Sequence, residues 1–324
     1  MVFALAHRPS GETVEFESLT EIEQAWASDG MSLWIDLEGP TQTEIQFLGR
    51  VFHLDPDTLE DCISGDQRPR IDEFDDYVFL VTYGMFGAEN ASEMIPRKLA
   101  AYCGPRFLLT AHTEPLRSIH AMRERCRRHG AQLMVRGVDF LLYSIMDSVI
   151  DKYALVVESY DERLDQLEEE SLAATPDGAV LEQAAELRRN LVDLRRLAAA
   201  QRDLLIPLAR GEYDYISNTL QTRFSHVRDH LTEVLESVEA QRELLKSIHD
   251  NYHTSLTNRL NQTTKLLSVF ATILLPLTLV TGIYGMNLPL WPPPEHPLSF
   301  WFVIAAMVTL SAGMLLAFRW KRWL

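Results

Sequence analysis

The sequence predicts an α+β domain, then long stalk helices and two C-terminal membrane-spanning helices. Strand-like and helix-like segments alternate over residues 1–130. No glycine or proline occurs between Gly211 and Pro276, so one long helix is expected there. Two stretches of 21 residues near the end carry no charged side chain, and about 20 apolar residues allow a helix to cross a bilayer. With 47% hydrophobic and 23% charged residues, the composition is that of a folded chain.

Residues 1–130 are expected to form an α/β/α domain around a mixed sheet. A polar helix is expected at Glu44–Phe52, and two strand-like segments are separated only by Gly104 and Pro105, a spacing typical of a β-hairpin. The strand-like segments are SLWIDLE, DYVFLVTYGMF, RKLAAYC and RFLLTAH. No glycine-rich phosphate loop follows any of them, and GxGxxG, GxSxG and HExxH are absent. We therefore expect neither an enzyme nor a bound cofactor.

Residues 131–210 have the pattern of an antiparallel helical hairpin, interrupted at the TPDG sequence of residues 175–178. The first helix ends in an acidic tip made of Asp161, Glu162, Asp165, Glu168, Glu169 and Glu170. Two interpretations stay open. The tip is either a solvated face or a salt-dependent contact with the basic tail at residues 319–324, which contains Arg319, Lys321 and Arg322.

The stalk helix is expected over residues 211–265 and continues into the first span, a helix on the order of 95 Å long at the standard rise. Residues with alternating spacings of four and three form a heptad seam, in which only Gln241 is polar. The seam residues are Leu220, Phe224, Val227, Leu231, Val234, Val238, Gln241, Leu245, Ile248 and Tyr252. This pattern predicts packing against other helices, and a coiled-coil spacer explains it fully.

The two uncharged stretches are residues 266–286 and 298–318, and we expect each to be a transmembrane helix. Lys265 and the tail at 319–324 carry the flanking positive charges, while the loop at 287–297 has no lysine or arginine. Basic residues favour the cytoplasmic side. The loop is therefore expected outside, with both termini in the cytoplasm of a multi-pass protein of the cell (inner) membrane. The N-terminus lacks the basic and long apolar regions of a signal peptide.

The net charge of −16 excludes binding of nucleic acid over most of the surface and favours cations as partners. The three cysteines, Cys62, Cys103 and Cys126, lie far apart and lack the CxxC spacing of a zinc finger. We expect them to be buried thiols.

A second face of the stalk helix carries a line of polar side chains that continues into the first span. Its residues recur at spacings of three, four and seven: Asp229, Glu236, Glu243, Asp250, His253, Thr257, Asn261, Thr264, Ser268, Leu275, Thr278 and Gly282. The acidic part alone is typical of a solvated surface, but its continuation through hydroxyl and amide side chains favours a water-filled path. One helix cannot enclose such a path, so the line predicts a homo-oligomeric channel or transporter.

Directly after the first span stands the sequence Tyr284-Gly285-Met286-Asn287, in which Asn287 is placed to form a ring of carboxamides at the outer mouth. At this point the chain strongly resembles the CorA family of divalent-cation channels, whose signature is the GMN triplet between two C-terminal spans. The resemblance extends through QRPRIDEFDDYVFLVTY, DFLLYSIMDSVIDKY, LEEESL, LRRNLVDLRR, ATILLPLTLVTGIYGMN and the terminal KRWL.

The resemblance implies a funnel-shaped homopentamer that admits Mg²⁺, tolerates Co²⁺ and Ni²⁺, and closes when intracellular Mg²⁺ bridges acidic faces of neighbouring subunits. By position in the motif, Gly285, Met286 and Asn287 are the selectivity mouth. The residues implied to line the pore are Thr278, Leu275, Ser268, Thr264, Asn261 and Asp250. Where many magnesium-gated members carry an acidic residue on the stalk, this chain has His226, so Asp229 is expected to replace it.

The bridging carboxylates on the α/β domain are left open, with Asp72, Asp75, Asp76 and Glu89 as candidates against Asp229 and Glu233 on the stalk. Zinc is the main rival to magnesium, because the chain also resembles the ZntB branch of zinc transporters. His226 with His230, and His249 with His253, have the i, i+4 spacing of zinc ligands, although such pairs are more often solvated. A third hypothesis is a membrane-anchored signalling or scaffold protein without ion conductance.

Overall fold

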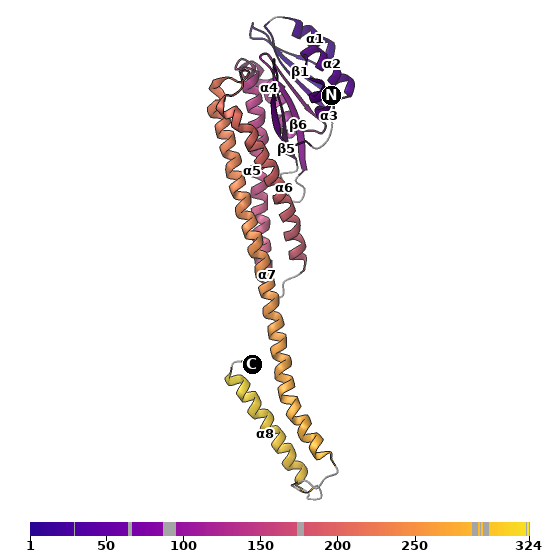
Figure 1. The fold of residues 1–324 in the computed structure, drawn as a ribbon, viewed down its shortest axis with the longest axis vertical. Coiled ribbons are helices and arrows are strands. Elements are labelled where there is room, and N and C mark those ends of the chain that lie inside the picture. Colours follow the sequence, from indigo (N-terminus) through magenta and orange to yellow (C-terminus); the bar gives the residue numbers. More distant parts are fainter. Residues whose placement is uncertain are drawn as a thin grey trace. The chain divides into compact units, whose positions relative to one another are not determined.

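The fold was examined in a computed structural model, which describes residues 1–28, 30–63, 67–86, 95–173, 178–286, 291, 293, 298–321 and 323. The chain divides into two compact units (Figure 1). The first unit comprises Met1–Glu169 and Ala179–Ile248, and the second comprises Glu170–Gly178 and His249–Leu324. The long helix α7, Gln221–Tyr284, contributes residues to both units.

The first unit contains a mixed sheet with the strand order β2-β1-β3-β7-β6-β5-β4. Only the β3–β7 pair is parallel among these neighbours, and the remaining pairs are antiparallel. Strands β6 and β7 form the hairpin expected around Gly104, whose N–H donates to the carbonyl of Phe107 at 2.9 Å. The strands are β1 Val2–His7, β2 Thr13–Phe16, β3 Ser32–Glu38, β4 Arg70–Glu73, β5 Val78–Phe86, β6 Ile95–Cys103 and β7 Phe107–His112.

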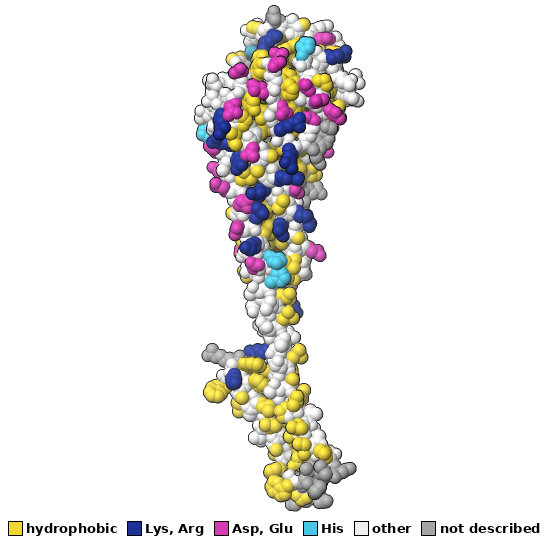
Figure 2. Space-filling model, in the orientation of Figure 1, with side chains coloured by type: hydrophobic (Ala, Val, Ile, Leu, Met, Phe, Trp, Pro, Cys, Tyr) yellow, Lys and Arg dark blue, Asp and Glu magenta, His cyan; other side chains and the backbone are white. Residues whose placement is uncertain are grey.

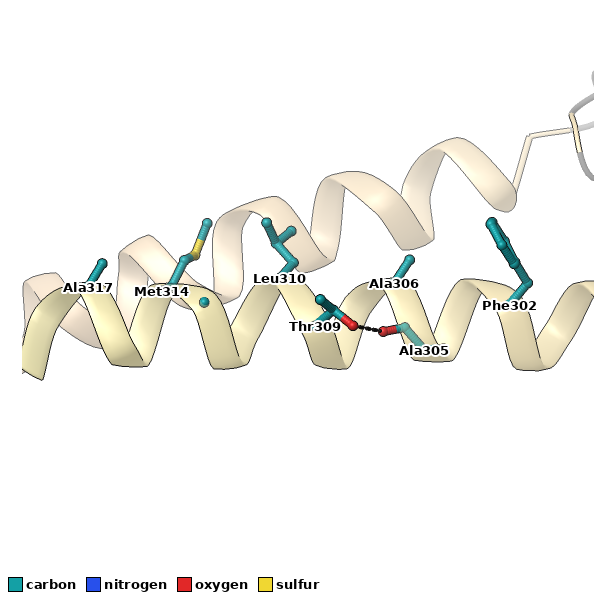
Figure 3. A pocket seen from close by; sticks show the side chains of 8 residues that line it. Phe302, Ala305, Ala306, Thr309, Leu310, Met314 and Ala317 are labelled. Atoms are coloured by element: carbon teal, nitrogen blue, oxygen red, sulfur yellow. Dashed lines mark hydrogen bonds between the residues drawn. The ribbon is translucent and has the colours of Figure 1, made fainter.

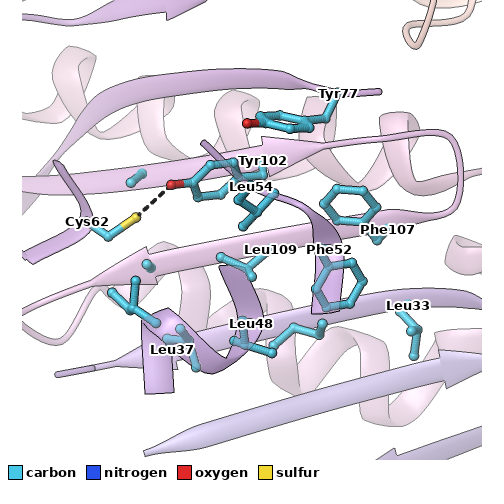
Figure 4. Close-up of a cluster of buried hydrophobic side chains, with 14 of the residues drawn as sticks. Leu33, Leu37, Leu48, Phe52, Leu54, Cys62, Tyr77, Tyr102, Phe107 and Leu109 are labelled. Carbon is cyan, nitrogen blue, oxygen red and sulfur yellow. Dashed lines mark hydrogen bonds between the residues drawn. The ribbon is translucent and has the colours of Figure 1, made fainter. Parts of the chain in front are cut away.

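Three short helices, α1 Leu19–Ala27, α2 Gln42–Phe52 and α3 Pro56–Ile63, pack an apolar core against the sheet. A capping box at Thr41 and Glu44 starts α2, so the expected helix at 44–52 is confirmed. The buried side chains of this core are shown in Figure 4, where the Cys62 thiol and the Tyr102 hydroxyl are 3.3 Å apart. Helix α4, Arg117–Met134, lies on the opposite face, where its side chain Arg123 reaches β3. The predicted α/β/α arrangement with a mixed sheet is confirmed.

Two long helices, α5 Val138–Ser171 and α6 Ala179–Arg210, form the rest of the first unit with the first part of α7. Gly211 ends α6 with a φ of +67°, and a Cβ at this position would collide with the side chain of Gln221. A short 3₁₀ helix, Asn218–Leu220, leads directly into α7. Helix α6 ends at Arg210, the end expected for the hairpin, whereas the stalk helix begins at Gln221 rather than at 211.

The whole predicted seam of α7 is buried. Phe224, Leu231, Val238 and Ile248 are each at most 1% exposed, and the remaining seam residues, including the polar Gln241, are also buried. The Gln241 side-chain amide donates to the Val157 carbonyl at 2.8 Å and to the Asp161 carboxylate at 2.7 Å. The Nε2 group of this polar side chain therefore has two acceptors on α5, whereas its buried Oε1 atom has no hydrogen-bond partner among the described residues.

The second unit is built mainly from the rest of α7 and from α8, Ser299–Trp320. Both helices are long and apolar enough to cross a membrane. Their apolar side chains are largely exposed in the single chain; Phe270 is 63% exposed and Leu316 is 68% exposed. Helix α7 continues through Pro276, which lacks the N–H that would bond to Thr272 one turn earlier.

Candidate functional site

The polar line on α7 is exposed along its whole length. Asp229, Glu236, Glu243, Asp250, His253, Thr257, Asn261, Thr264, Ser268, Leu275, Thr278 and Gly282 all have exposed positions in the structure. The seam and the line therefore occupy different sides of one helix: the first is covered by the chain itself and the second is not.

Two hydroxyl groups of the line, those of Thr257 and Thr278, donate their protons within the helix. Thr257 donates to the carbonyl of His253 at 2.8 Å, and Thr278 donates to the carbonyl of Leu274 at 2.9 Å. Thr272, a neighbour outside the line, donates to the carbonyl of Ser268 at 2.7 Å in the same way. Because their protons are engaged, the hydroxyls of Thr257 and Thr278 present oxygen lone pairs as acceptors. An exposed row of oxygen acceptors suits a hydrated cation, whose waters donate hydrogen bonds.

The end of the first span is described up to Met286. The Gly285 N–H donates to the Thr281 carbonyl at 2.9 Å, and the Met286 N–H donates to the Ile283 carbonyl at 3.1 Å. Asn287, the residue expected to form the outer mouth, lies outside the described residues, as do Glu295 and His296 of the loop. The Tyr284 hydroxyl donates to the Trp291 carbonyl at 2.9 Å, which connects the end of α7 to the loop.

Helix α8 carries an apolar groove that faces one side of the helix. Figure 3 shows Phe302, Ala306, Leu310 and Met314 pointing in the same direction, while the Thr309 hydroxyl bonds to the Ala305 carbonyl at 2.8 Å. Small side chains let helices approach closely within a bilayer. The groove is therefore suited to contact with lipid or with another helix, and the hydroxyl of Thr309, the one polar side chain among its lining residues, is bonded within α8.

The carboxylates expected to bridge subunits have partners within the chain or lie exposed. The Asp229 carboxylate is 2.8 Å from Arg228, and the Asp72 carboxylate is 2.7 Å from Arg70. The backbone carbonyl of Asp75 accepts a hydrogen bond from Tyr215. Glu89 lies outside the described residues. Among the residues that the structure describes, no three metal-ligating side chains converge within one chain.

A cluster between α5 and α7 was not found from the sequence. Burial raises the pKa of Asp147, and the neighbouring charge of Asp151 raises it further, against the opposing effects of Tyr143 and His230. Asp151 lies 3.9 Å from the Nδ1 atom of His230. The i, i+4 spacing of the two aspartates on α5 was the available signal, but only the fold shows that α7 supplies the facing histidine.

A second missed group lies under α4, where Asp36 is completely buried. Its carboxylate accepts a hydrogen bond from Arg123 Nε at 2.7 Å and lies 3.4 Å from His112 Nε2. Burial alone would raise the pKa of Asp36, but His112, Arg123 and the Thr110 hydroxyl together hold it below its usual value. This network ties β3, β7 and α4 together and is separate from the polar line on α7.

An α/β/α domain followed by a helical bundle and two apolar C-terminal helices, with a polar line entering the first of them, defines an integral membrane protein of the ion-transport class. The chain belongs to the family described as CorA-like Mg²⁺ transporter proteins, whose pattern matches residues 29–322. It is therefore a divalent-cation transporter of this family and not an enzyme, and the transported ion, rather than a cofactor, is its small-molecule partner.

Two known proteins show how far the likeness extends. The cobalt/magnesium transport protein CorA of Thermotoga maritima is 31% identical over 292 residues, which cover 90% of this chain and 83% of that protein. The complete structure of the CorA magnesium transporter from Methanocaldococcus jannaschii matches with a TM-score of 0.86 and 25% identity, over 100% of this chain and 99% of that one. The predicted fold and the predicted family are both confirmed.

The zinc branch is also found among structures of similar fold. The cytoplasmic domain of ZntB from Vibrio parahaemolyticus matches with a TM-score of 0.59 and 14% identity, covering 79% of this chain and 98% of that one. At this identity the match reports a shared fold alone and does not bear on the transported ion.

Proposed function

We propose that the chain assembles into a homopentameric channel that carries Mg²⁺, and also Co²⁺ and Ni²⁺, into the cell across the cytoplasmic membrane. Both termini lie in the cytoplasm, and intracellular Mg²⁺ closes the channel. The observation that carries the proposal is the polar line that runs along α7 from Asp229 to Gly282 and is exposed throughout; as far as Tyr252, the other side of the helix is the buried seam.

The chemistry of the line fits a hydrated divalent cation. Mg²⁺ loses its waters reluctantly, so a path that accepts hydrogen bonds from those waters costs less than one that replaces them. Asn261, Thr264, Ser268 and Thr278 supply neutral oxygen acceptors, and Asp250 supplies negative charge at the cytosolic end. Leu275, 70% exposed in the single chain, provides a constriction without a polar group. Gly285, Met286 and Asn287 form the outer mouth.

The repulsion between carboxylates explains how intracellular Mg²⁺ closes the channel. Facing carboxylates on neighbouring subunits repel each other unless a divalent cation lies between them. Asp229, with Glu233 on the same helix, is the proposed stalk contribution, opposite Asp72, Asp75, Asp76 or Glu89 of a neighbour. Asp229 is 58% exposed at its side chain, so it is accessible to a second subunit despite its contact with Arg228.

Cysteine scanning tests the orientation of the line. The three native cysteines are buried, and burial raises the pKa of Cys62 to about 11 and of Cys126 to about 12, so they react slowly with thiol reagents at neutral pH. The variants Thr257→Cys, Asn261→Cys and Thr264→Cys should react with a charged, water-soluble thiol reagent in the reconstituted protein.

The matched controls are Leu267→Cys and Phe270→Cys, which carry the new thiol on apolar positions of the same helix, 65% and 63% exposed in the single chain. They should react slowly once lipid covers them. Equal reaction rates at the polar and the apolar positions would contradict a water-filled path along the line.

Asn287→Ala tests the outer mouth. We expect Mg²⁺ uptake into proteoliposomes to fall by about tenfold or more, because the ring of carboxamides that orders the hydrated ion is lost. Size-exclusion chromatography of the variant controls for assembly. Undiminished uptake by a correctly assembled variant would remove Asn287 from the selectivity mouth.

Zinc transport coupled to protons is the second candidate, because His249 and His253 are exposed at the cytosolic end of the polar line. Zinc prefers nitrogen ligands, and histidine changes its charge near neutral pH. A pH gradient across proteoliposomes should then change the rate of Zn²⁺ uptake. Uptake that does not respond to the gradient would eliminate proton coupling.

A further inference from the structure

His249 and His253 lie one turn apart on an exposed side of α7. The centroids of their rings are 4.5 Å apart at an interplanar angle of 61°. The His249 side chain is 58% exposed, and the side chains that face the bundle at this level are instead those of Ile248 and Tyr252. Histidine side chains gathered on the surface of the helical part are visible in Figure 2.

This spacing presents both imidazoles to one ion. Two histidines at i and i+4 on a helix face are the arrangement by which the HExxH helix holds zinc. The Asp250 carboxylate lies 3.8 Å from the Nδ1 atom of His249. At this distance the carboxylate does not hydrogen-bond to the ring, but its negative charge lies beside the histidine pair and favours a bound cation.

We propose that His249 and His253 together bind a transition-metal ion of the Zn²⁺ class on the cytosolic part of α7. Imidazole nitrogen favours Zn²⁺, Co²⁺ and Ni²⁺, whereas Mg²⁺ favours oxygen ligands and keeps its waters. The site thus distinguishes transition metals from the main cargo. Water fills the remaining coordination positions, because no third ligand converges on the pair among the residues described for one chain.

The location of the site gives it an effect on transport, and this step rests on the proposed function. His253 and Asp250 both belong to the polar line, at the cytosolic side of Thr257 and Asn261. A bound divalent ion partly neutralises Asp250 and adds positive charge beside the path. Because like charges repel, Mg²⁺ should pass more slowly when the site is occupied.

Binding is tested by calorimetric titration of the purified full-length protein with Zn²⁺ in excess Mg²⁺. His253→Gln should weaken one class of Zn²⁺ sites by tenfold or more, and His249→Gln should do the same. His226→Gln removes a histidine from the same helix and should leave this class unchanged. Since all three side chains are exposed, the variants are expected to fold, and circular dichroism checks this.

Cu²⁺ serves as a spectroscopic probe of the same site. Its electron paramagnetic resonance spectrum should show coupling to two imidazole nitrogens in the wild type and lose that feature in His253→Gln. Zn²⁺ affinity and Cu²⁺ spectra identical to the wild type in this variant would overturn the site.

The effect on transport is measured separately, as Mg²⁺ flux with and without Zn²⁺ on the cytosolic side. Zn²⁺ should slow the wild type and have no effect on His253→Gln. Equal inhibition of both proteins would overturn the regulatory half of the inference. Absence of Mg²⁺ flux in the wild type without Zn²⁺ would contradict the proposed function instead, and the binding experiment would still decide the metal site.

Discussion

The two parts of α7 bury their apolar side chains in different ways. In the part that belongs to the first unit, Phe224 is completely buried by the chain's own helices. In the part that belongs to the second unit, Phe270 is 63% exposed although it is the same residue type on the same helix. The comparison shows that one helix is stabilised by protein packing over residues 221–248, whereas most of its apolar surface beyond them needs lipid or other subunits.

The largest expected effect comes from replacing a phenylalanine by alanine in the first part of α7, compared with the same replacement in the second part. Phe224→Ala should lower the free energy of unfolding by about 3–5 kcal/mol, because it leaves a cavity in a packed seam. Phe270→Ala is the matched control and should change the stability of the detergent-solubilised protein by less than about 1 kcal/mol. Both are measured by chemical denaturation followed by near-UV circular dichroism. Similar losses in the two variants would mean that the second part is also packed by protein.

A buried charge provides a second test of how the first unit is stabilised. The carboxylate of Asp36 is buried there and needs partners within the protein. Arg123→Met leaves this carboxylate without its main cationic partner and should cost about 3–5 kcal/mol. Arg125→Met, two residues further along α4 and exposed, should cost no more than about 0.5 kcal/mol. Denaturation midpoints of the two variants at pH 7 give the comparison.

The direction of the pKa shift of Asp36 determines how its contribution to stability changes with pH. Its pKa is lowered in the folded protein, so the carboxylate contributes stability above its unfolded pKa of about 3.9. That contribution is lost as the pH falls through the folded value. In Arg123→Met the buried carboxyl loses one of the groups that lower its pKa, so burial raises that pKa and the variant takes up a proton at a higher pH than the wild type does. The difference between the two proteins should therefore shrink as the pH falls from 7, and a difference that does not change with pH would show that Asp36 is not the group responsible.

Much of this contrast is predictable from the sequence. The seam is confirmed along its length. Residues with heptad spacing lie on one side of a helix, and this side is the one that packs against other helices. The hairpin at Gly104 follows from local turn chemistry. Strand β1 was missed because Val2–His7 has no polar alternation: most of it is buried on both faces. Strand β2 was missed because it is a four-residue strand at the sheet edge.

Contacts between distant residues could not be predicted in the same way. Asp36 and Arg123 are 87 positions apart, and neither stands in a motif. Asp151 and His230 meet only because α5 and α7 pack side by side. The polar line is a local helical pattern that can be read from the sequence, and its residues are exposed in the structure of the single chain. The periodicity of a helix can thus be predicted from one sequence, whereas contacts between side chains of different helices and strands can be identified only once the fold is known.

A moderate effect is expected for the one polar residue of the seam. Gln241→Ala leaves the Val157 carbonyl and the Asp161 carboxylate without their donor and should cost about 1–3 kcal/mol. Asn261→Ala, an exposed amide in the second unit, is the control and should not change stability measurably. The same two variants should rank in the opposite order in Mg²⁺ uptake, where Asn261 lines the proposed path.

The smallest expected effect concerns an exposed ion pair of the first unit. Glu239 accepts a hydrogen bond from Arg195 on α6, and this bond, together with the charges of Arg242 and Arg195, lowers the pKa of Glu239 against the opposing effect of desolvation. Because both partners are about half exposed, solvent screens the pair, and Glu239→Gln should cost less than about 1 kcal/mol at pH 7.

The dependence of stability on pH and on salt distinguishes the contribution of this ion pair from that of apolar packing. A carboxylate with a lowered pKa stabilises the fold above its unfolded pKa of about 4.3, and the contribution disappears as the pH falls through the folded value. The difference between the wild type and Glu239→Gln should therefore vanish in strongly acidic solution, and also at about 1 M salt, where the Debye length is about 3 Å. The effect of Phe224→Ala should persist under both conditions, because a cavity has no charge to screen. A Glu239→Gln effect that survives high salt would mean that the contact between α6 and α7 depends on side-chain packing at this position.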